Sequence, residues 1–196
     1  MTDGLLETDV KEFLTNRIVC LIGFMGSGKT FIGEYLAKEL GAELIETDTL
    51  IEGIENQPIS QIFRERGERY FRSLEKRVLQ DLVFSQSILD REKQNCYIIS
   101  TGGGLPIQRG NRKLLKLLNS FNICLNPPFD VIMNRIRRTK RPLVYRRSRS
   151  HIFDLWQSRY EVYQRTADIS ISEVTVENVF RAINERVRLY SQSIEH

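Results

Sequence analysis

An octapeptide near the N-terminus constrains the fold more than any other feature of the sequence. Residues 23–30 read GFMGSGKT and match the pattern G-x-x-x-x-G-K-[ST] at every fixed position. The octapeptide follows an apolar run at 18–22 and precedes apolar residues at helical spacing that end before Gly41. A strand, a glycine-rich turn and an amphipathic helix in this order are typical of a phosphate-binding loop.

Each polar position of this loop has an expected role toward a nucleoside triphosphate. The backbone N–H groups of Gly26, Ser27 and Gly28 are expected to bind phosphate oxygens. Lys29 would reach the β- and γ-phosphates, and the hydroxyl of Thr30 would bind Mg²⁺. A chance match is the alternative, but the flanking strand and helix favour a site for ATP with Mg²⁺ as cofactor.

Five short apolar runs recur along the 196 residues, with helical spacing of apolar residues between them. The runs lie at 18–22, 43–47, 96–100, 121–125 and 167–171. They are nearly continuous rather than alternating, as expected for strands that helices cover on both faces. We therefore predict one α/β domain with a five-stranded parallel sheet flanked by helices.

The second apolar run ends in two carboxylates, Glu46 and Asp48. The third run, which often supplies a metal-binding acid in proteins with this loop, continues as STGGG without one. Residues at i and i+2 of a strand point to the same face, close to the sheet edge where α/β proteins bind ligands. We predict that Glu46 lies near magnesium and Asp48 near the substrate. The alternative is that both are solvated acids at a strand end.

Charge and cysteine content limit the remaining function classes. The three cysteines lie in apolar runs without metal-ligand spacing, which favours buried thiols in a reducing compartment. The first fourteen residues carry four acids, and no apolar stretch is long enough to span a membrane, so a cytoplasmic protein is expected. Basic residues cluster between 135 and 149, which is compatible with a nucleic-acid surface.

Several motifs together resemble the shikimate kinase family from about residue 17 to about residue 186. They are GFMGSGKT, ETD at 46–48, IF at 62–63, GE-x-x-FR-x-x-E at 67–75, GGG at 102–104, RPL at 141–143 and R-x-x-x-Y-x-x-x-A at 159–167. The resemblance implies a P-loop fold like that of nucleoside monophosphate kinases, with strand order 2-3-1-4-5. It divides the chain into an N-terminal extension, 1–16, and a single kinase domain, 17–196.

The resemblance also implies where substrates bind. The substrate-binding segment is expected at about 48–80 and the lid at about 135–150. The carboxylate of shikimate would be bound by Arg72 and Arg159, and its ring hydroxyls by Asp48, Gly103 and Gly104. Two arginines suit a carboxylate because each guanidinium can donate two parallel hydrogen bonds.

Neighbouring residues are expected to shape this acceptor site. Glu75, three residues after Arg72 on a helix, would fix the arginine's rotamer, although a surface ion pair would have the same spacing. Phe63 and Phe71 would form an apolar wall or simply pack in the core. Arg135, Arg137 and Arg138 are candidates for further contacts with ATP.

The implied reaction is phosphorylation of the 3-hydroxyl of shikimate by ATP, giving shikimate 3-phosphate in aromatic amino-acid (chorismate) biosynthesis. Asp48 would orient or deprotonate the hydroxyl, while Lys29 and Arg141 offset charge on the γ-phosphoryl group. Glu46 departs from the aspartate usual in the family. Its extra methylene reaches about 1.5 Å further, so it either replaces a water that bridges to the metal or crowds the metal.

Three alternatives remain open at this point. The chain could be a non-catalytic ATP-binding regulatory module, a nucleic-acid-associated ATPase that uses the basic stretch, or a related small-molecule kinase such as a gluconate kinase. The paired arginine motifs favour the shikimate reading, with a monomer that binds neither nucleic acid nor membrane.

Overall fold

The strand β1 (Ile18–Ile22) is buried along its whole length and divides its side chains between the two faces of a sheet. Val19 and Leu21 pack into one hydrophobic cluster, whereas Ile18 and Cys20 pack into a second. Successive side chains of a strand point to opposite faces, so both faces of this strand must be covered.

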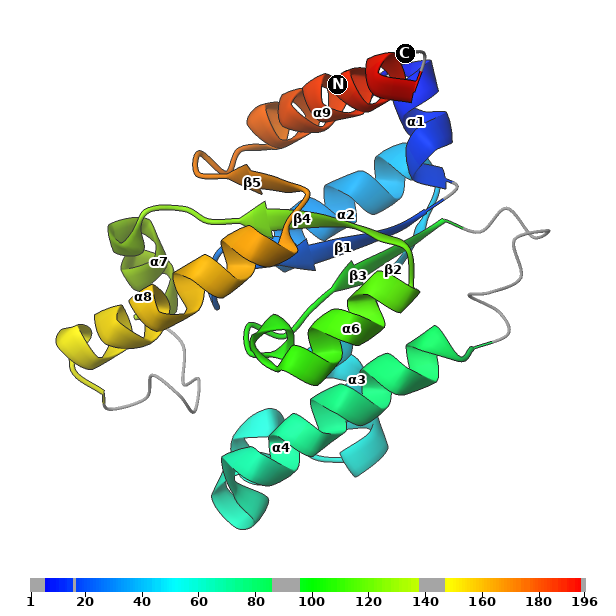
Figure 1. Cartoon of the computed structure of the whole chain (residues 1–196). Coiled ribbons are helices and arrows are strands. Elements are labelled where there is room, and N and C mark those ends of the chain that lie inside the picture. The colour runs from blue at the N-terminus through cyan, green and yellow to red at the C-terminus, as the bar shows by residue number, and fades with distance from the viewer. Residues whose placement is uncertain (1–5, 16, 86–95, 138–146, 195–196) are drawn as a thin grey trace.

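The computed structural model describes residues 6–15, 17–85, 96–137 and 147–194 (Figure 1). The other strands are β2 (Glu43–Glu46), β3 (Tyr97–Ser100), β4 (Ser120–Leu125) and β5 (Ile169–Ile171). The helices are α1 (Thr8–Thr15), α2 (Lys29–Leu40), α3 (Thr47–Glu55), α4 (Ile59–Val83), the 3₁₀ turn η2 (Leu105–Ile107), α6 (Arg109–Leu117), α7 (Phe129–Ile136), α8 (Arg149–Thr166) and α9 (Val176–Ile194).

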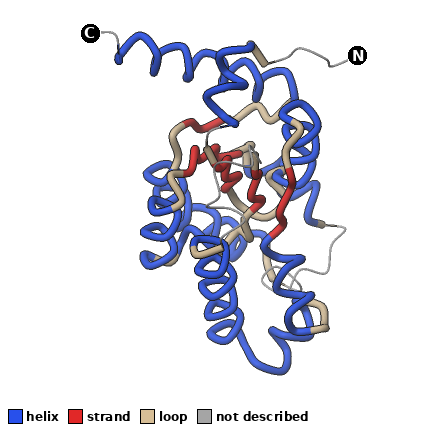
Figure 2. The backbone as a smooth tube through the Cα atoms, turned by 90° about the vertical axis from the view of Figure 1, so that its right-hand side faces the viewer, coloured by secondary structure: helices blue, strands red, loops and turns tan. Residues whose placement is uncertain are grey.

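The five strands form one parallel sheet in the order β2-β3-β1-β4-β5. This confirms the predicted strand number, direction and order, and the predicted bounds differ from the observed ones by at most two residues. Helices lie on both sides of the strands (Figure 2). None of the helices in the described part of the chain combines the length and apolar composition needed to cross a bilayer.

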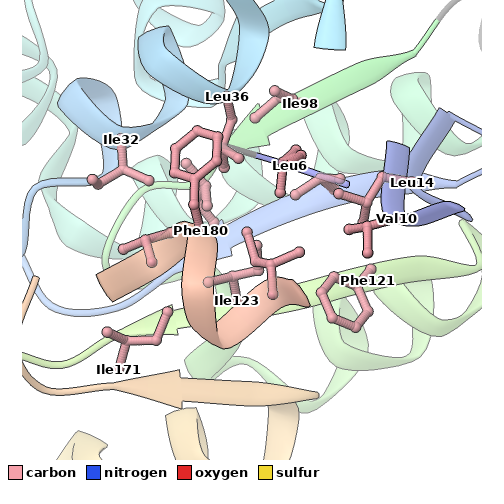
Figure 3. Close-up of a cluster of buried hydrophobic side chains, with 14 of the residues drawn as sticks. Leu6, Val10, Leu14, Ile32, Leu36, Ile98, Phe121, Ile123, Ile171 and Phe180 are labelled. Carbon is pink, nitrogen blue, oxygen red and sulfur yellow. The ribbon is translucent and has the colours of Figure 1, made fainter. Parts of the chain in front are cut away.

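Helices α1, α2 and α9 cover one face of the sheet, where the largest hydrophobic cluster lies (Figure 3). Helix α2 ends at Gly41, whose φ of 60° is left-handed, as the sequence predicts for a helix C-terminus. Helices α3, α4 and α6 contribute to the second cluster on the opposite face. Loops that lead to helices on both faces of the sheet therefore meet at the carboxyl ends of the parallel strands.

Helix α1, in the segment 1–16 that the resemblance implies is an N-terminal extension, contributes to the same core as the sheet. Leu6, Val10 and Leu14 are buried in the first cluster. The Lys11 ammonium lies 2.8 Å from the Glu39 carboxylate of α2. The described part of this segment therefore packs on the same face of the sheet as α2 and α9.

A third cluster fixes helices α7 and α8 at the carboxyl edge of the sheet. Ile22, Phe24 and Cys124 from the sheet side pack there against Ile132 of α7 and Tyr163 of α8. All three cysteines are free and buried, as predicted. Burial raises the pKa of the Cys20 thiol to about 12 and those of the other two to about 11, so the thiols stay protonated.

Candidate active site

The phosphate-binding loop connects β1 to α2 and has the backbone conformation that its glycines permit. Gly28, immediately before α2, has a φ of 105°, and Gly26 has a φ of 77°. Residues other than glycine rarely adopt these φ values. The loop leads into the N-terminus of α2, whose first N–H groups have no partner within the helix and favour an anion.

Lys29 and Thr30 begin α2 and point their polar atoms at the loop and the sheet edge. The Lys29 ammonium donates to the backbone oxygens of Gly23 and Phe24, at 3.0 Å each. The Thr30 hydroxyl donates to Oε1 of Glu46, at the end of β2. One cation and one hydroxyl–carboxylate pair therefore lie beside the loop.

Arg135 brings a second cation to the loop from α7. Its Nη1 donates to the backbone oxygens of Gly26 (3.2 Å) and Ser27 (3.1 Å). Of the two candidate arginines for ATP that the structure describes, Arg135 is the one that lines the cavity at the loop. Arg137 lies at the exposed C-terminus of α7, and Arg138 lies outside the described residues.

A cavity of about 300 Å³ opens above the loop. Its lining includes Lys29, Thr30, Glu46, Asp48, Gly103 and Arg135. Oxygen ligands of this kind suit Mg²⁺, which retains waters and binds only one or two protein groups next to a nucleotide. Within the described residues no three histidine, cysteine or acidic side chains gather as a metal site. Thr30 and Glu46 therefore fit a magnesium ion held mainly by phosphates and water.

A second cavity of about 420 Å³ lies beside the first. Helices α3, α4 and α8 and the glycine turn after β3 enclose it, and its lining contains all five residues predicted to bind the substrate: Asp48, Arg72, Gly103, Gly104 and Arg159. Phe63 and Phe71, with ring centroids 4.7 Å apart, line one side. The cavity thus combines two arginines, an aromatic wall and the carboxylates of Asp48, Glu52 and Glu75.

Arg72 is positioned by two carboxylates on its own helix. Its Nη1 lies 2.8 Å from Oε2 of Glu75, and its Nη2 lies 2.7 Å from Oε1 of Glu68. Burial lowers the pKa of Arg72, but these two partners raise it by more, so the guanidinium stays charged. Helix α4 is interrupted at Gly67 (φ 77°), one residue before Glu68.

Glu75 is fully buried beneath the arginine. Burial raises the pKa of Glu75, an effect that Arg72 opposes and Asp48 reinforces. Gln108 donates to Oε2 of Glu75 (3.3 Å) and to the backbone oxygen of Arg72 (3.2 Å), which the sequence did not suggest. Within the described residues, Oε1 of Glu75 has no hydrogen-bond partner.

Arg159 approaches the cavity from α8. It is only 6% exposed, and its guanidinium lies 5.7 Å from the centre of the Phe24 ring. Its Nη1 is buried without a hydrogen-bond partner among the described residues. A buried cationic donor without an acceptor is costly, so this atom is suited to an anionic group of a ligand in the cavity.

The glycine turn is shaped by its neighbours. A β-carbon at Gly102 would collide with Oδ1 of Asp48, and one at Gly104 would collide with the guanidinium of Arg72. Glycine at these positions therefore allows both polar side chains to lie against the backbone. Packing of these two side chains is therefore a second reason for glycine in this turn, beside the predicted close approach of a ligand.

Asp48 reaches the cavities from a helix, which corrects the prediction that it shares a strand with Glu46. Strand β2 ends at Glu46, and Asp48 lies in the first turn of α3. The buried Thr47 hydroxyl accepts from the Gly102 N–H (2.8 Å), a link that joins the start of α3 to the turn after β3. Glu46 and Asp48 both line the first cavity because α3 begins where β2 ends, and not because they point to the same face of one strand.

Tyr163 is a further residue of the site whose contact the sequence did not reveal. Its hydroxyl donates to the backbone oxygen of Gly103, and burial raises its pKa, so the phenol stays protonated. Tyr163 follows Arg159 by four residues, so both lie on the same face of α8. This four-residue spacing is the sequence pattern from which the position of Tyr163 next to the site could have been predicted.

Arg141 and most of the predicted lid lie outside the described residues. The structure describes only 135–137 and 147–150 of the expected lid at 135–150. The part of the basic stretch that is described includes Arg149, which forms an ion pair with Asp130 of α7.

Comparison with known proteins identifies relatives over almost the whole chain. A family model described as shikimate kinase matches residues 25–188. A shikimate kinase of Persephonella marina is 38% identical over 157 residues, which cover 80% of this chain and 88% of that protein. A shikimate kinase of Dehalococcoides mccartyi is 33% identical over 182 residues, which cover 91% of this chain and 98% of that protein.

Two solved structures share the fold at comparable identity. Shikimate kinase from Acinetobacter baumannii, in complex with shikimate, superposes with a TM-score of 0.76 and 29% identity, covering 94% of this chain and 98% of that one. Shikimate kinase from Aquifex aeolicus superposes with a TM-score of 0.72 and 32% identity, covering 88% and 97%.

Proposed function

The chain belongs to the shikimate kinase family, and from that membership we propose that it transfers the γ-phosphoryl group of ATP to the 3-hydroxyl of shikimate. The products are shikimate 3-phosphate and ADP, within aromatic amino-acid biosynthesis. One observation carries the proposal: two adjoining cavities, one at the phosphate loop and one containing two arginines, share Asp48 and Gly103 in their linings.

The second cavity suits a small carboxylated polyol. Arg72 and the buried Nη1 of Arg159 provide cationic donors for a carboxylate. Phe63 and Phe71 offer an apolar surface to one side of a ring. Asp48 lies at the boundary with the nucleotide cavity, where the reacting hydroxyl must be placed.

The first cavity suits a triphosphate. The N–H groups at the start of α2 and the ammonium of Lys29 converge on it, and Arg135 adds positive charge from α7. The Thr30 hydroxyl would bind magnesium directly. The Glu46 carboxylate, which accepts a hydrogen bond from that hydroxyl, would support the ion without binding it directly. When bound, Mg²⁺ offsets charge on the phosphate oxygens.

In the proposed reaction, Asp48 accepts a hydrogen bond from the 3-hydroxyl and orients its oxygen toward the γ-phosphorus. The new O–P bond forms as the bond from phosphorus to the β–γ bridging oxygen breaks, and the hydroxyl proton leaves by way of Asp48. Lys29 stabilises the developing charge on the γ-phosphoryl oxygens. Arg141 has the same predicted role and lies outside the described residues.

We also propose that the enzyme works as a cytoplasmic monomer. Three buried, unpaired thiols are typical of proteins from a reducing compartment. Within the described residues, a single chain supplies both the phosphate loop and the arginine pair.

The proposal is tested by coupled measurement of ADP release with shikimate, with gluconate and without an acceptor. We expect ATP-dependent turnover with shikimate alone. Turnover only with gluconate would identify a related kinase, and ATP binding without turnover would identify a non-catalytic module. Turnover that requires added nucleic acid would instead support the ATPase alternative; each of these results contradicts the proposal.

A further inference from the structure

Phe31 is a large, exposed aromatic residue in the nucleotide cavity that the reaction described above does not use. It follows Thr30 in the first turn of α2 and is 51% exposed. Its side chain lines the cavity of the phosphate loop together with Lys29 and Thr30. Single exposed apolar side chains are common on proteins, but this one lies where a ligand binds.

The Phe31 ring has a defined support. Its centroid lies 5.0 Å from that of Tyr35, one helical turn later, with the rings tilted by 60°. Tyr35 is half-buried and packs against the first hydrophobic cluster, whereas Phe31 belongs to none of the three clusters. Tyr35 therefore links Phe31 to the core, while about half of the Phe31 surface stays exposed at the cavity.

The polar groups around Phe31 indicate which part of a nucleotide it would contact. Phosphate oxygens are matched by Lys29, by the N–H groups of the loop and by Thr30, whereas a phenyl ring has no donor for them. The remainder of ATP is a ribose and a purine with a large aromatic face. Such faces stack on aromatic side chains irrespective of the base.

We propose that Phe31 forms an apolar platform for the nucleoside part of ATP and so contributes to nucleotide affinity. This inference rests on the proposed function, because it assumes that the cavity binds ATP. Tyr35 acts through Phe31 by supporting the ring. The contact stabilises bound nucleoside triphosphates and leaves the affinity for an inorganic polyphosphate unchanged.

The test compares MgATP with magnesium tripolyphosphate, which has three phosphates but no nucleoside, by titration calorimetry. In Phe31→Ala we expect Kd for MgATP to rise about tenfold, within the range of base–aromatic stacking, and Kd for tripolyphosphate to stay unchanged. The matched control is Phe84→Ala, which removes a 69%-exposed phenylalanine at the end of α4 and should alter neither Kd.

An unchanged Kd for MgATP in Phe31→Ala would overturn the inference, as would equal weakening of both ligands, which would indicate a disturbed phosphate loop. A wild-type protein that binds neither ligand would contradict the proposed function itself. A Phe31→Trp variant gives a second readout. Its added fluorescence should change with MgATP and not with magnesium tripolyphosphate; equal responses to both, or no response to either, would also reject the platform.

Discussion

Asp48 and Gly103 each line both the cavity at the phosphate loop and the cavity of the arginine pair. A phosphoryl group that moves from nucleotide to acceptor must cross the boundary that these two residues form. Thr47, next to Asp48, accepts from the Gly102 N–H, so the two sides of the boundary are tied together by a buried hydrogen bond. Positioning of donor and acceptor is the main contribution that a protein makes to phosphoryl transfer.

Tyr163→Phe should lower kcat/KM for shikimate by roughly two- to tenfold. The substitution removes only the hydroxyl that donates to the Gly103 backbone oxygen, and one hydrogen bond contributes about 0.5–1.5 kcal/mol. Steady-state kinetics with shikimate varied measures the effect. Tyr160→Phe is the control, because Tyr160 is 40% exposed on the same helix. Equal kinetics for wild type and Tyr163→Phe would show that Gly103 needs no such support.

Arg159→Lys should raise KM for shikimate about 10- to 100-fold while leaving KM for ATP unchanged. Lysine keeps the charge but lacks the planar pair of donors, and charge-assisted hydrogen bonds contribute about 1.5–3 kcal/mol. Arg165→Lys serves as the matched control, since the Arg165 side chain is 81% exposed and pairs with Glu161. A larger rise in KM for ATP than in KM for shikimate would contradict the prediction that Arg159 binds shikimate.

The strands and the phosphate-binding loop could be predicted from the sequence, whereas contacts between distant residues could not. Apolar runs and helical spacing predicted all five strands, because burial on both faces leaves a continuous apolar signature. The glycine-rich octapeptide predicted the loop, because the required conformation restricts the residue types. Contacts such as Gln108 with Glu75 join residues 33 positions apart and leave no local pattern.

The element that carries Asp48 was predicted wrongly for a physical reason. Strand β2 continues to Glu46, but the Thr47 hydroxyl accepts a hydrogen bond from the turn after β3, and α3 begins there. An acid in the first turn of a helix is favourable near the positive end of the helix dipole. The sequence predicted that Asp48 would lie near the substrate but not the helix that positions it.

Glu75→Gln should remove an acid limb from the pH profile of kcat/KM for shikimate. Because burial raises the pKa of Glu75, it takes up a proton at a higher pH than an exposed glutamate does. Protonation weakens its ion pair with Arg72, so shikimate binding should weaken as pH falls through that raised pKa. The amide in the Glu75→Gln variant cannot titrate, and the pH profile of that variant should be flatter on the acid side.

Glu68→Gln provides the control for that profile, because Glu68 pairs with the same arginine from a 52%-exposed position. Its acid limb should match that of the wild type. An unchanged acid limb in Glu75→Gln would exclude Glu75 as the titrating group.

Glu46→Asp should keep turnover within about threefold of wild type, whereas Glu46→Gln should raise the Mg²⁺ concentration needed for half-maximal turnover. Thr30 donates to Glu46, so a carboxylate at this position would orient the hydroxyl oxygen toward a bound magnesium ion, and its charge would support the cation. Magnesium titration of turnover measures both variants. Glu43→Gln, at the exposed start of β2, is the control. Identical Mg²⁺ dependence in Glu46→Gln and wild type would contradict the role of Glu46.

The most direct test of the account is the rate of phosphoryl transfer to shikimate by Asp48→Asn. Asparagine preserves the volume beside Gly102 but removes the charge that we propose orients the 3-hydroxyl and accepts its proton. We predict that kcat falls by at least about a hundredfold, the usual contribution of general base catalysis, while Kd for MgATP is unchanged. Near-normal kcat in Asp48→Asn would contradict the central claim that Asp48 activates the acceptor at the boundary of the two cavities.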